Sequence, residues 1–322
     1  MTILTAALAL TLLQPLPHGG PFRAARPSWG GPFTAAMPIQ QLPHQPGAPQ
    51  TDETVAVQKG ARLVVNNFAG EVVVHTWDRD SVHVTARHQT RTKVNIRQTA
   101  SGLTISASGT MGPASAVDYD ITAPAWMPVR VEGTYNFVTV EGAQAEVSAE
   151  SVRGDIVVKG GAGFVTAKSI QGEIVVEGSR GRIAAQSVNE AIRITDSTGE
   201  ITAESTNGAI TMMRCSAQSV DASTVNGDIT YDGALAASGH YQFSTHNGDV
   251  SLSIPETANA TFTVRTYNGE FRSDLPLKGA SPEDMRRGRP VQMTLGSGAA
   301  DVNIESFGGS IRIRKAGSPE RK

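Results

Sequence analysis

A nine-residue repeat in the middle of the chain constrains its fold more than any other feature. From Gly154 the sequence divides into nine blocks, seven of which open with Gly, and the third position of every block is Ile or Val. The series runs from GDIVVKGGA through GEIVVEGSR and GEITAESTN to GDITYDGAL, with Ala217 inserted before the eighth block. A β-branched residue at a fixed distance after a glycine predicts a short strand following a tight turn, repeated along the chain.

The fifth position of the blocks shows that the true period is twice as long. Large residues alternate there with alanine: Val158, Val176, Ile194, Met212 and Tyr231 against Ala167, Ala185, Ala203 and Ala222. The third and fifth positions of a strand share one face, which we expect to point inward. The fold class is therefore all-β. We predict a β-solenoid, or β-helix, with coils of about eighteen residues, each giving two strands that face each other across a thin core.

Polar residues recur at fixed positions of the blocks whose fifth residue is alanine, which we call the alanine blocks. These residues predict structural ladders. A hydroxyl ladder comprises Ser169, Ser187, Ser205 and Thr224, and an amide ladder comprises Asn189, Asn207, Asn226, Asn247 and Asn268. Stacked amides can hydrogen-bond from coil to coil, so these residues receive a scaffold role rather than a binding role. The asparagine spacing lengthens to 21 beyond Asn226, and residues 307–313 are interpreted as a last, degenerate copy of the repeat.

The remaining segments predict an exported protein. Residues 1–20 contain an apolar run that suits an export signal, and the Pro- and Gly-rich residues 21–50 suit a disordered linker. Residues 51–135 predict a less regular β-region that caps the N-terminal end of the solenoid, residues 136–315 the regular solenoid, and residues 316–322 a disordered tail. We expect the periplasm, cell surface or extracellular medium, with no transmembrane segment beyond the signal. The alternative is a wrongly chosen start codon ahead of a soluble protein.

Composition argues against several function classes. The net charge of −2 offers no general attraction to nucleic acid. Cys215 is the only cysteine, so no internal disulfide or cysteine-based metal site can form, and we expect no cofactor. The acidic residues that follow the turn glycines fall on opposite edges of the coils, which disfavours a calcium ladder. No Gly-x-Ser-x-Gly elbow and no Gly-Lys-Ser/Thr phosphate loop is present.

Two clusters remain as weak site candidates. His75 and His83 flank an expected hairpin and could form a zinc pair, although ordinary exposed strand histidines are favoured because no third ligand is placed. Arg286, Arg287 and Arg289 could bind anionic envelope polymers or lipid headgroups, although a solvated loop is favoured.

Three stretches of sequence resemble a known family. They are the Asn66–Val72 opening with His75-Thr76-Trp77-Asp78, the Ser/Thr-x-Asn-Gly-Asp-Ile repeats, and the closing segment from Gly296 to Arg314. They resemble the bacterial "putative adhesin" family of secreted β-solenoid domains, a family catalogued as of unknown function, over residues 52–315. The resemblance implies the solenoid fold and an adhesin-like role, and it brings no catalytic residues.

Together these features predict a non-catalytic protein of the cell envelope or medium. It would serve as an adhesin-like binding module or a structural scaffold, with an envelope polysaccharide or a surface protein as its expected partner. Two alternatives stay open. One is a carbohydrate-active β-helix enzyme, either a polysaccharide lyase or a glycoside hydrolase. The other is an envelope scaffold that self-assembles through the strand edges at the solenoid ends.

Overall fold

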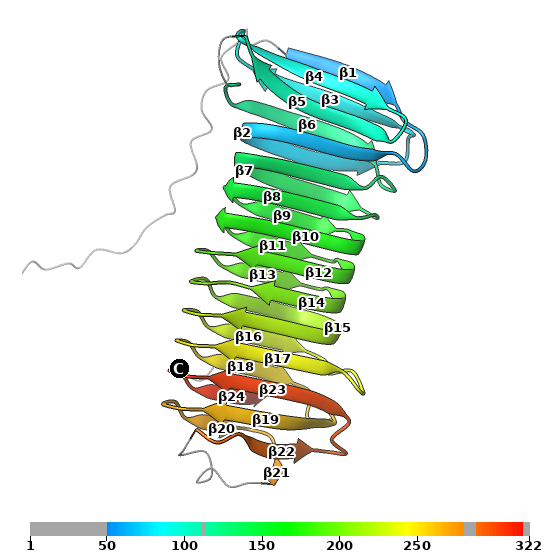
Figure 1. The fold of residues 1–322 in the computed structure, drawn as a ribbon. Helices are drawn as coiled ribbons and strands as arrows, with labels where there is room; N and C mark the ends of the chain where they lie inside the picture. Colours follow the sequence, from blue (N-terminus) through cyan, green and yellow to red (C-terminus); the bar gives the residue numbers. More distant parts are fainter. Residues whose placement is uncertain (1–49, 111–113, 280–287, 318–322) are drawn as a thin grey trace, which may run out of the picture. The chain divides into compact units, whose positions relative to one another are not determined.

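The computed structural model describes residues 50–110, 114–279 and 288–317, which contain strands and no helix. The predicted signal at 1–20, nearly all of the linker at 21–50, residues 318–322 of the tail, and Arg286 and Arg287 lie outside these ranges. The strands join in one sheet of 24 strands (Figure 1). Most pairs are parallel, so the described chain is all-β with a solenoid-like arrangement.

Two walls run through the sheet. The first wall contains β9 (Ile156–Gly160), β11 (Ile174–Glu177), β13 (Ile192–Thr195), the start of β15 (Ile210–Thr224) and β16 (Ile229–Gly233). The second wall contains β8 (Val147–Arg153), β10 (Ala162–Gln171), β12 (Arg180–Ser187), β14 (Thr198–Glu204) and the end of β15. Along the second wall Val165 pairs with Ile183, and Ile183 with Ile201.

The third and fifth block positions form the core. Ile174 and Val176 on the first wall and Ala185 on the second are fully buried. Outward residues alternate with them, as strand geometry requires. Alanine on the second wall leaves room for the larger side chains that face it, which fits close packing between two thin layers.

The turn glycines are explained by how closely stacked turns approach. A Cβ on Gly208 would lie 1.9 Å from the backbone oxygen of Glu190 in the preceding coil, and one on Gly172 would lie 2.0 Å from that of Gly154. A side chain there would push the coils apart and break their hydrogen bonds. The structure accommodates the one-residue insertion in the repeat as a β-bulge. Gly199 pairs with Ala217 while Glu200 pairs with Ser219, so Gln218 has no partner in β14 (Thr198–Glu204).

Antiparallel pairs concentrate at the N-terminal end of the sheet. β1 (Gln50–Ala56), β3 (Ser81–His88) and β6 (Val117–Pro124) pair antiparallel in the order β1–β3–β6, and β4 (Thr92–Thr99) pairs antiparallel with β5 (Gly102–Gly109). β2 (Arg62–Trp77) and β7 (Val129–Ala143) are long enough to run through both walls and pair with each other throughout.

The C-terminal strands do not stack in sequence order. β17 (His240–Thr245) and β19 (Ala260–Thr266) both pair with β23 (Ala300–Ser306), while β18 (Val250–Ile254) and β20 (Phe271–Ser273) both pair with β24 (Ile311–Lys315). The final coil therefore lies between two earlier ones (Figure 1). The chain turns back through β22 (Val291–Leu295), which pairs antiparallel with β19 and with β21 (Lys278–Gly279). Residues 307–313, interpreted from the sequence as the last copy of the repeat, are last along the chain but lie between two earlier coils in space.

Within residues 50–110, 114–279 and 288–317, no helix is long and apolar enough to cross a membrane.

Candidate functional site

The asparagines form a connected row of amides along one turn edge. Asn207 Nδ2 donates to Asn189 Oδ1 at 3.0 Å, and Asn226 Nδ2 donates to Asn207 Oδ1 at 2.9 Å. Asn247 Nδ2 continues the row onto Asn226 Oδ1 at 2.8 Å. We call the line of turns that carries these residues the Asn edge. From Asn207 to Asn247 each amide donates to the coil before it, and from Asn189 to Asn226 each accepts from the coil after it.

The row stops where the final coil is inserted. Thr245 pairs with Ser306, and Ser306 pairs with Thr266, so Gly308 lies between Asn247 and Asn268. The expected ladder contact between the two asparagines is therefore absent. Within the described residues, Asn247 Oδ1 and the Asn268 amide have no side-chain hydrogen bond, and both asparagines are exposed. Among the described residues, an acceptor and a complete amide thus have no side-chain partner at this break.

The hydroxyl residues bond to turn backbone rather than to one another. Thr224 Oγ1 donates to the backbone oxygen of Gly208 at 3.1 Å, Ser169 Oγ donates to that of Gly154 at 3.3 Å, and Ser205 Oγ accepts from the Gly208 amide at 2.9 Å. Ser187 Oγ accepts from the amide of Glu190. These hydroxyls are buried, so they satisfy backbone groups of the turns and are not available to a ligand.

The histidine candidates lie on different strands and do not meet. His75 and His83 both pair with Thr122, so β6 separates them, whereas the sequence suggested neighbouring hairpin strands. His75 Nδ1 lies 3.5 Å from Glu141, and His83 Nδ1 lies 3.0 Å from Thr54 Oγ1. No group of three metal-ligating side chains occurs among the described residues. Arg289 is exposed, and its two arginine neighbours lie outside the described ranges.

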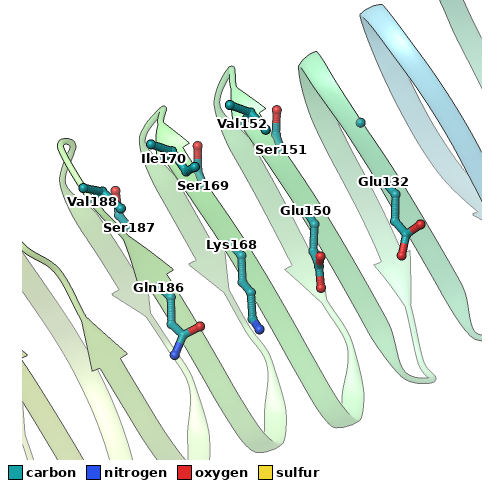
Figure 2. Close-up of a pocket in the computed structure, with 11 residues that line it drawn as sticks. Glu132, Glu150, Ser151, Val152, Lys168, Ser169, Ile170, Gln186, Ser187 and Val188 are labelled. Carbon is teal, nitrogen blue, oxygen red and sulfur yellow. The ribbon is translucent and has the colours of Figure 1, made fainter.

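A line of exposed apolar side chains on the Asn edge was missed by sequence reasoning. Val152, Ile170, Val188 and Val225 are 44%, 45%, 38% and 45% exposed. Figure 2 shows the first three on successive coils, beside Ser151, Ser169 and Ser187 respectively. We call these four residues the apolar ridge. The available signal was parity: Ile170, Val188 and Val225 occupy the eighth block position, which points outward, in three of the four alanine blocks, and Val152 lies eighteen residues before Ile170.

An open groove of about 560 Å³ runs beside the ridge on the second wall. Its floor carries Glu132, Glu150, Lys168 and Gln186, one from each of four consecutive coils (Figure 2). The groove is thus shallow, long and of mixed charge, with an apolar border.

Aromatic rings occupy the same edge at the two ends of the ridge. Near the N-terminal end, Phe68 meets Tyr135 edge-on at 5.6 Å. Near the inserted coil, the rings of His246 and Phe307 stack at 4.7 Å, and Tyr267 lies 5.0 Å from Phe307. We call the latter three residues the aromatic platform. Phe307 and Tyr267 are 41% and 39% exposed.

Two carboxyls and one thiol of the described chain have pKa values shifted in directions that bear on catalysis. Lys159 donates to Glu141 and lowers the pKa of that carboxyl, and Arg214 lowers the pKa of Asp196 in the same way. A general acid at neutral pH needs the opposite shift. Burial raises the pKa of the Cys215 thiol, which makes it a poor nucleophile. These two carboxyls and this thiol of the described chain therefore lack the pKa shifts that a general acid or a nucleophile needs.

Comparison with known proteins adds a family. The family model described as Toastrack DUF4097 matches residues 61–314. No curated protein matches the chain.

Three solved structures are similar to this chain at low identity. A "putative adhesin" from Bacteroides fragilis shows 12% identity and a TM-score of 0.34, covering 83% of this chain and 98% of its own. A second, from Parabacteroides distasonis, shows 9% identity and a TM-score of 0.32, covering 83% and 97%. A "putative cell adhesion protein" from Clostridium sporogenes shows 8% identity and a TM-score of 0.22, covering 83% and 100%. TM-scores of this size carry no functional statement.

Proposed function

The chain belongs to the Toastrack DUF4097 family, which confirms the resemblance read from the sequence, and we propose that it is an exported, non-catalytic binding scaffold. Its ligand is a polymer of the bacterial cell envelope, and the binding surface is the Asn edge with the adjoining groove. The body is a solenoid of eighteen-residue coils, capped at one end by the antiparallel strands β1, β3 and β4.

One observation carries the proposal: the apolar ridge lies in line on a solvent-facing edge, interrupted only by Thr206 between Val188 and Val225. Single exposed apolar residues are ordinary on protein surfaces, but a contiguous row marks a contact site more often. Val152, Ile170 and Val188 occupy consecutive coils, and the groove of about 560 Å³ lies beside them. A straight border of this kind suits a long ligand better than a small molecule, which would be enclosed in a deeper pocket.

Export is supported by the apolar segment and the Pro-rich stretch that precede β1. Protease treatment of intact cells tests it. We expect the chain to be degraded at the cell surface, or after the outer envelope is opened. Protection in cells whose envelope has been opened but whose cytoplasmic membrane is intact would contradict export.

Sedimentation with isolated envelopes tests the binding. Full-length protein is mixed with envelopes from the organism that encodes it, and the bound fraction is measured across protein concentrations. We expect Val188→Lys to weaken binding about tenfold, because a charge replaces an apolar contact at the ridge. Val175→Lys, on the outer face of the first wall, is the matched control and should bind as the unmodified chain does. Absence of envelope binding by the unmodified chain, or equal effects of the two substitutions, would overturn the proposal.

A further inference from the structure

A short trough crosses two turns of the Asn edge, and we call it the glycine trough. Its floor is Gly154 and Gly172, and its volume is about 390 Å³. Phe137 borders it toward the N-terminal end, and Glu190 toward the C-terminal end. Glu190 stands where seven of the nine repeat blocks open with glycine, whereas the turns that follow it stack glycine on glycine. The floor is therefore limited to two coils by a side chain that departs from the repeat.

The two long sides of the glycine trough carry opposite charge. Arg153 and Asp155 flank Gly154 in one coil, and neither forms an ion pair within the described part of the chain. Gln171 pairs with Arg153 in the next coil and accepts from its Nε at 2.7 Å, which orients the cationic side. Asp155 Oδ1 accepts from the Glu173 amide at 2.8 Å, which orients the acidic side. A ligand that lies across the floor therefore meets a cation on one side and a carboxylate on the other.

The acidic side also presents an aromatic ring. Phe137 lies on this side in the coil before Asp155, and its side chain is 57% exposed. Among the described residues no ring or guanidinium packs on Phe137, whereas Tyr135 meets both Phe68 and Arg153. An exposed ring beside a carboxylate attracts an ammonium group through both its quadrupole and the neighbouring charge.

Carboxylates outnumber free cations around the glycine trough. Glu190 has no ion pair within residues 50–110, 114–279 and 288–317, and the exposed Glu71 lies beside the ring, one coil before it. Glu173 is compensated, because Arg193 donates to it at 3.2 Å. A purely anionic ligand would face the carboxylates, and a neutral ligand would use neither charge. The charges therefore favour a ligand with an ammonium for the acidic side and an anionic group for the arginine side.

We propose that the glycine trough binds a zwitterionic peptide unit of the cell-wall polymer, one that carries a free ammonium and a free carboxylate. The ammonium lies on the acidic side, next to Phe137, Asp155 and Glu190, and the carboxylate meets Arg153 across the floor. This inference rests on the proposed envelope binding and names the ligand class at one site of the Asn edge.

Saturation-transfer NMR titrations on the full-length chain test the ligand class. The probe is the tetrapeptide L-alanyl-γ-D-glutamyl-L-lysyl-D-alanine, compared with one analogue acetylated at both amines and one amidated at both carboxylates. We expect the parent peptide to bind, and each analogue to bind at least about fivefold more weakly, because each lacks one of the two charges. Glycerophosphoethanolamine, which carries a phosphate in place of the carboxylate, should bind more weakly than the parent peptide.

Charge-removing variants test the site. Glu190→Gln should weaken the parent peptide about three- to fivefold and leave the acetylated analogue unchanged, because the lost attraction is to the ammonium. Arg153→Gln should weaken the parent peptide to a similar degree and leave the amidated analogue unchanged. Glu177→Gln, which removes an exposed carboxylate at the far end of β11 from the trough, is the matched control and should alter none of the three.

The pattern across the peptides separates binding from a structural effect. Equal weakening of all three by Glu190→Gln would overturn the site, as would an unchanged affinity for the parent peptide. Failure of the parent peptide to bind the unmodified chain, or tighter binding of glycerophosphoethanolamine, would overturn the ligand class. Glu190→Gly restores the residue that opens most blocks and serves as a second variant with an intact turn. Envelope sedimentation that persists in Glu190→Gly, combined with failure of the peptide, would reject this site and leave the proposed function standing.

Discussion

The rings of His246 and Phe307 stack in parallel at 4.7 Å, although their coils are separated in the sequence by the strands β18 to β23. This contact exists because β23 enters the sheet between β17 and β19. The aromatic platform, the end of the amide row and the free polar groups of Asn247 and Asn268 all follow from that one insertion. Its consequences can be tested separately from ligand binding.

The inserted coil should control the stability of strands that lie far from it in sequence. Val302 is fully buried and pairs with Tyr241 on one side and Phe262 on the other. Val302→Asp places an unpaired charge in the core, which costs several kcal/mol. Hydrogen exchange should then show loss of protection in both β17 and β19. Asn303→Asp, at the adjacent outward position, should leave both strands protected. Loss of protection confined to β23 would contradict the insertion.

The amide row should contribute measurably to stability. Asn207 both donates to Asn189 and accepts from Asn226, so Asn207→Ala removes two neutral hydrogen bonds. We expect a loss of about 1–2 kcal/mol in the free energy of unfolding, measured by urea denaturation. Asn268→Ala is the matched comparison, because Asn268 lies beyond the end of the row, and it should change stability by less than about 0.5 kcal/mol. Equal losses in the two variants would show that the row has no structural role.

Alkaline pH should destabilise the protein through buried phenols. Burial raises the pKa of Tyr231 and Tyr241 above the ordinary value of about 10. The folded state holds these protons to higher pH than the unfolded state does. Their contribution to the free energy of unfolding is therefore complete below pH about 10 and is lost as the pH rises through their folded-state pKa values. Urea midpoints measured across this range should stay level and then fall.

A matched pair of tyrosine variants identifies the groups responsible. Tyr231→Phe should make the alkaline fall smaller, because only Tyr241 of the pair then contributes, whereas Tyr135→Phe, at an exposed position, should leave it unchanged. An unchanged fall in Tyr231→Phe would assign the pH dependence to other groups.

The single thiol should be protected in the folded protein. Cys215 is buried, its pKa is raised by that burial, and its sulfur lies 3.7 Å from the backbone oxygen of Ile194. Alkylation by iodoacetamide at neutral pH should be at least about a hundredfold slower in native protein than in urea-unfolded protein, as measured by mass spectrometry. Comparable rates would mean that this part of the core opens readily.

Much of the fold was present in local sequence. The alternation of Ile or Val with outward polar residues predicted the buried positions, from Ile156 to Ile229, because a strand places every second residue on one face. The turn glycines predicted the turns, and the structure adds that Gly208 is required by a carbonyl of the coil before it. The family resemblance was also readable from the motifs, and the family match bears it out.

The candidate site was only partly readable. Ile170 and Val188 point outward by parity, but periodicity alone does not show whether another layer covers an outward residue. For the histidines, the sequence suggested a proximity that the structure does not have. His75 and His83 lie on β2 and β3, which are consecutive in sequence, and β6, the third strand after β3, separates them in space. Local patterns do not specify which later strand inserts between two earlier ones.

The sequence by itself thus determined the strands, the inward faces, the turn glycines and the order of asparagines from Asn189 to Asn247, because all of these depend on residues one coil apart. Only the tertiary structure decided that Phe307 lies between His246 and Tyr267. That placement depends on a chain reversal through β22, which pairs antiparallel with β19. After this reversal, β23 and β24 lie between coils that come earlier in the sequence. Parallel strands make the same backbone hydrogen bonds whether the coils stack in sequence order or with the final coil inserted between two earlier ones. Long-range packing, and not the repeat, therefore selects the arrangement.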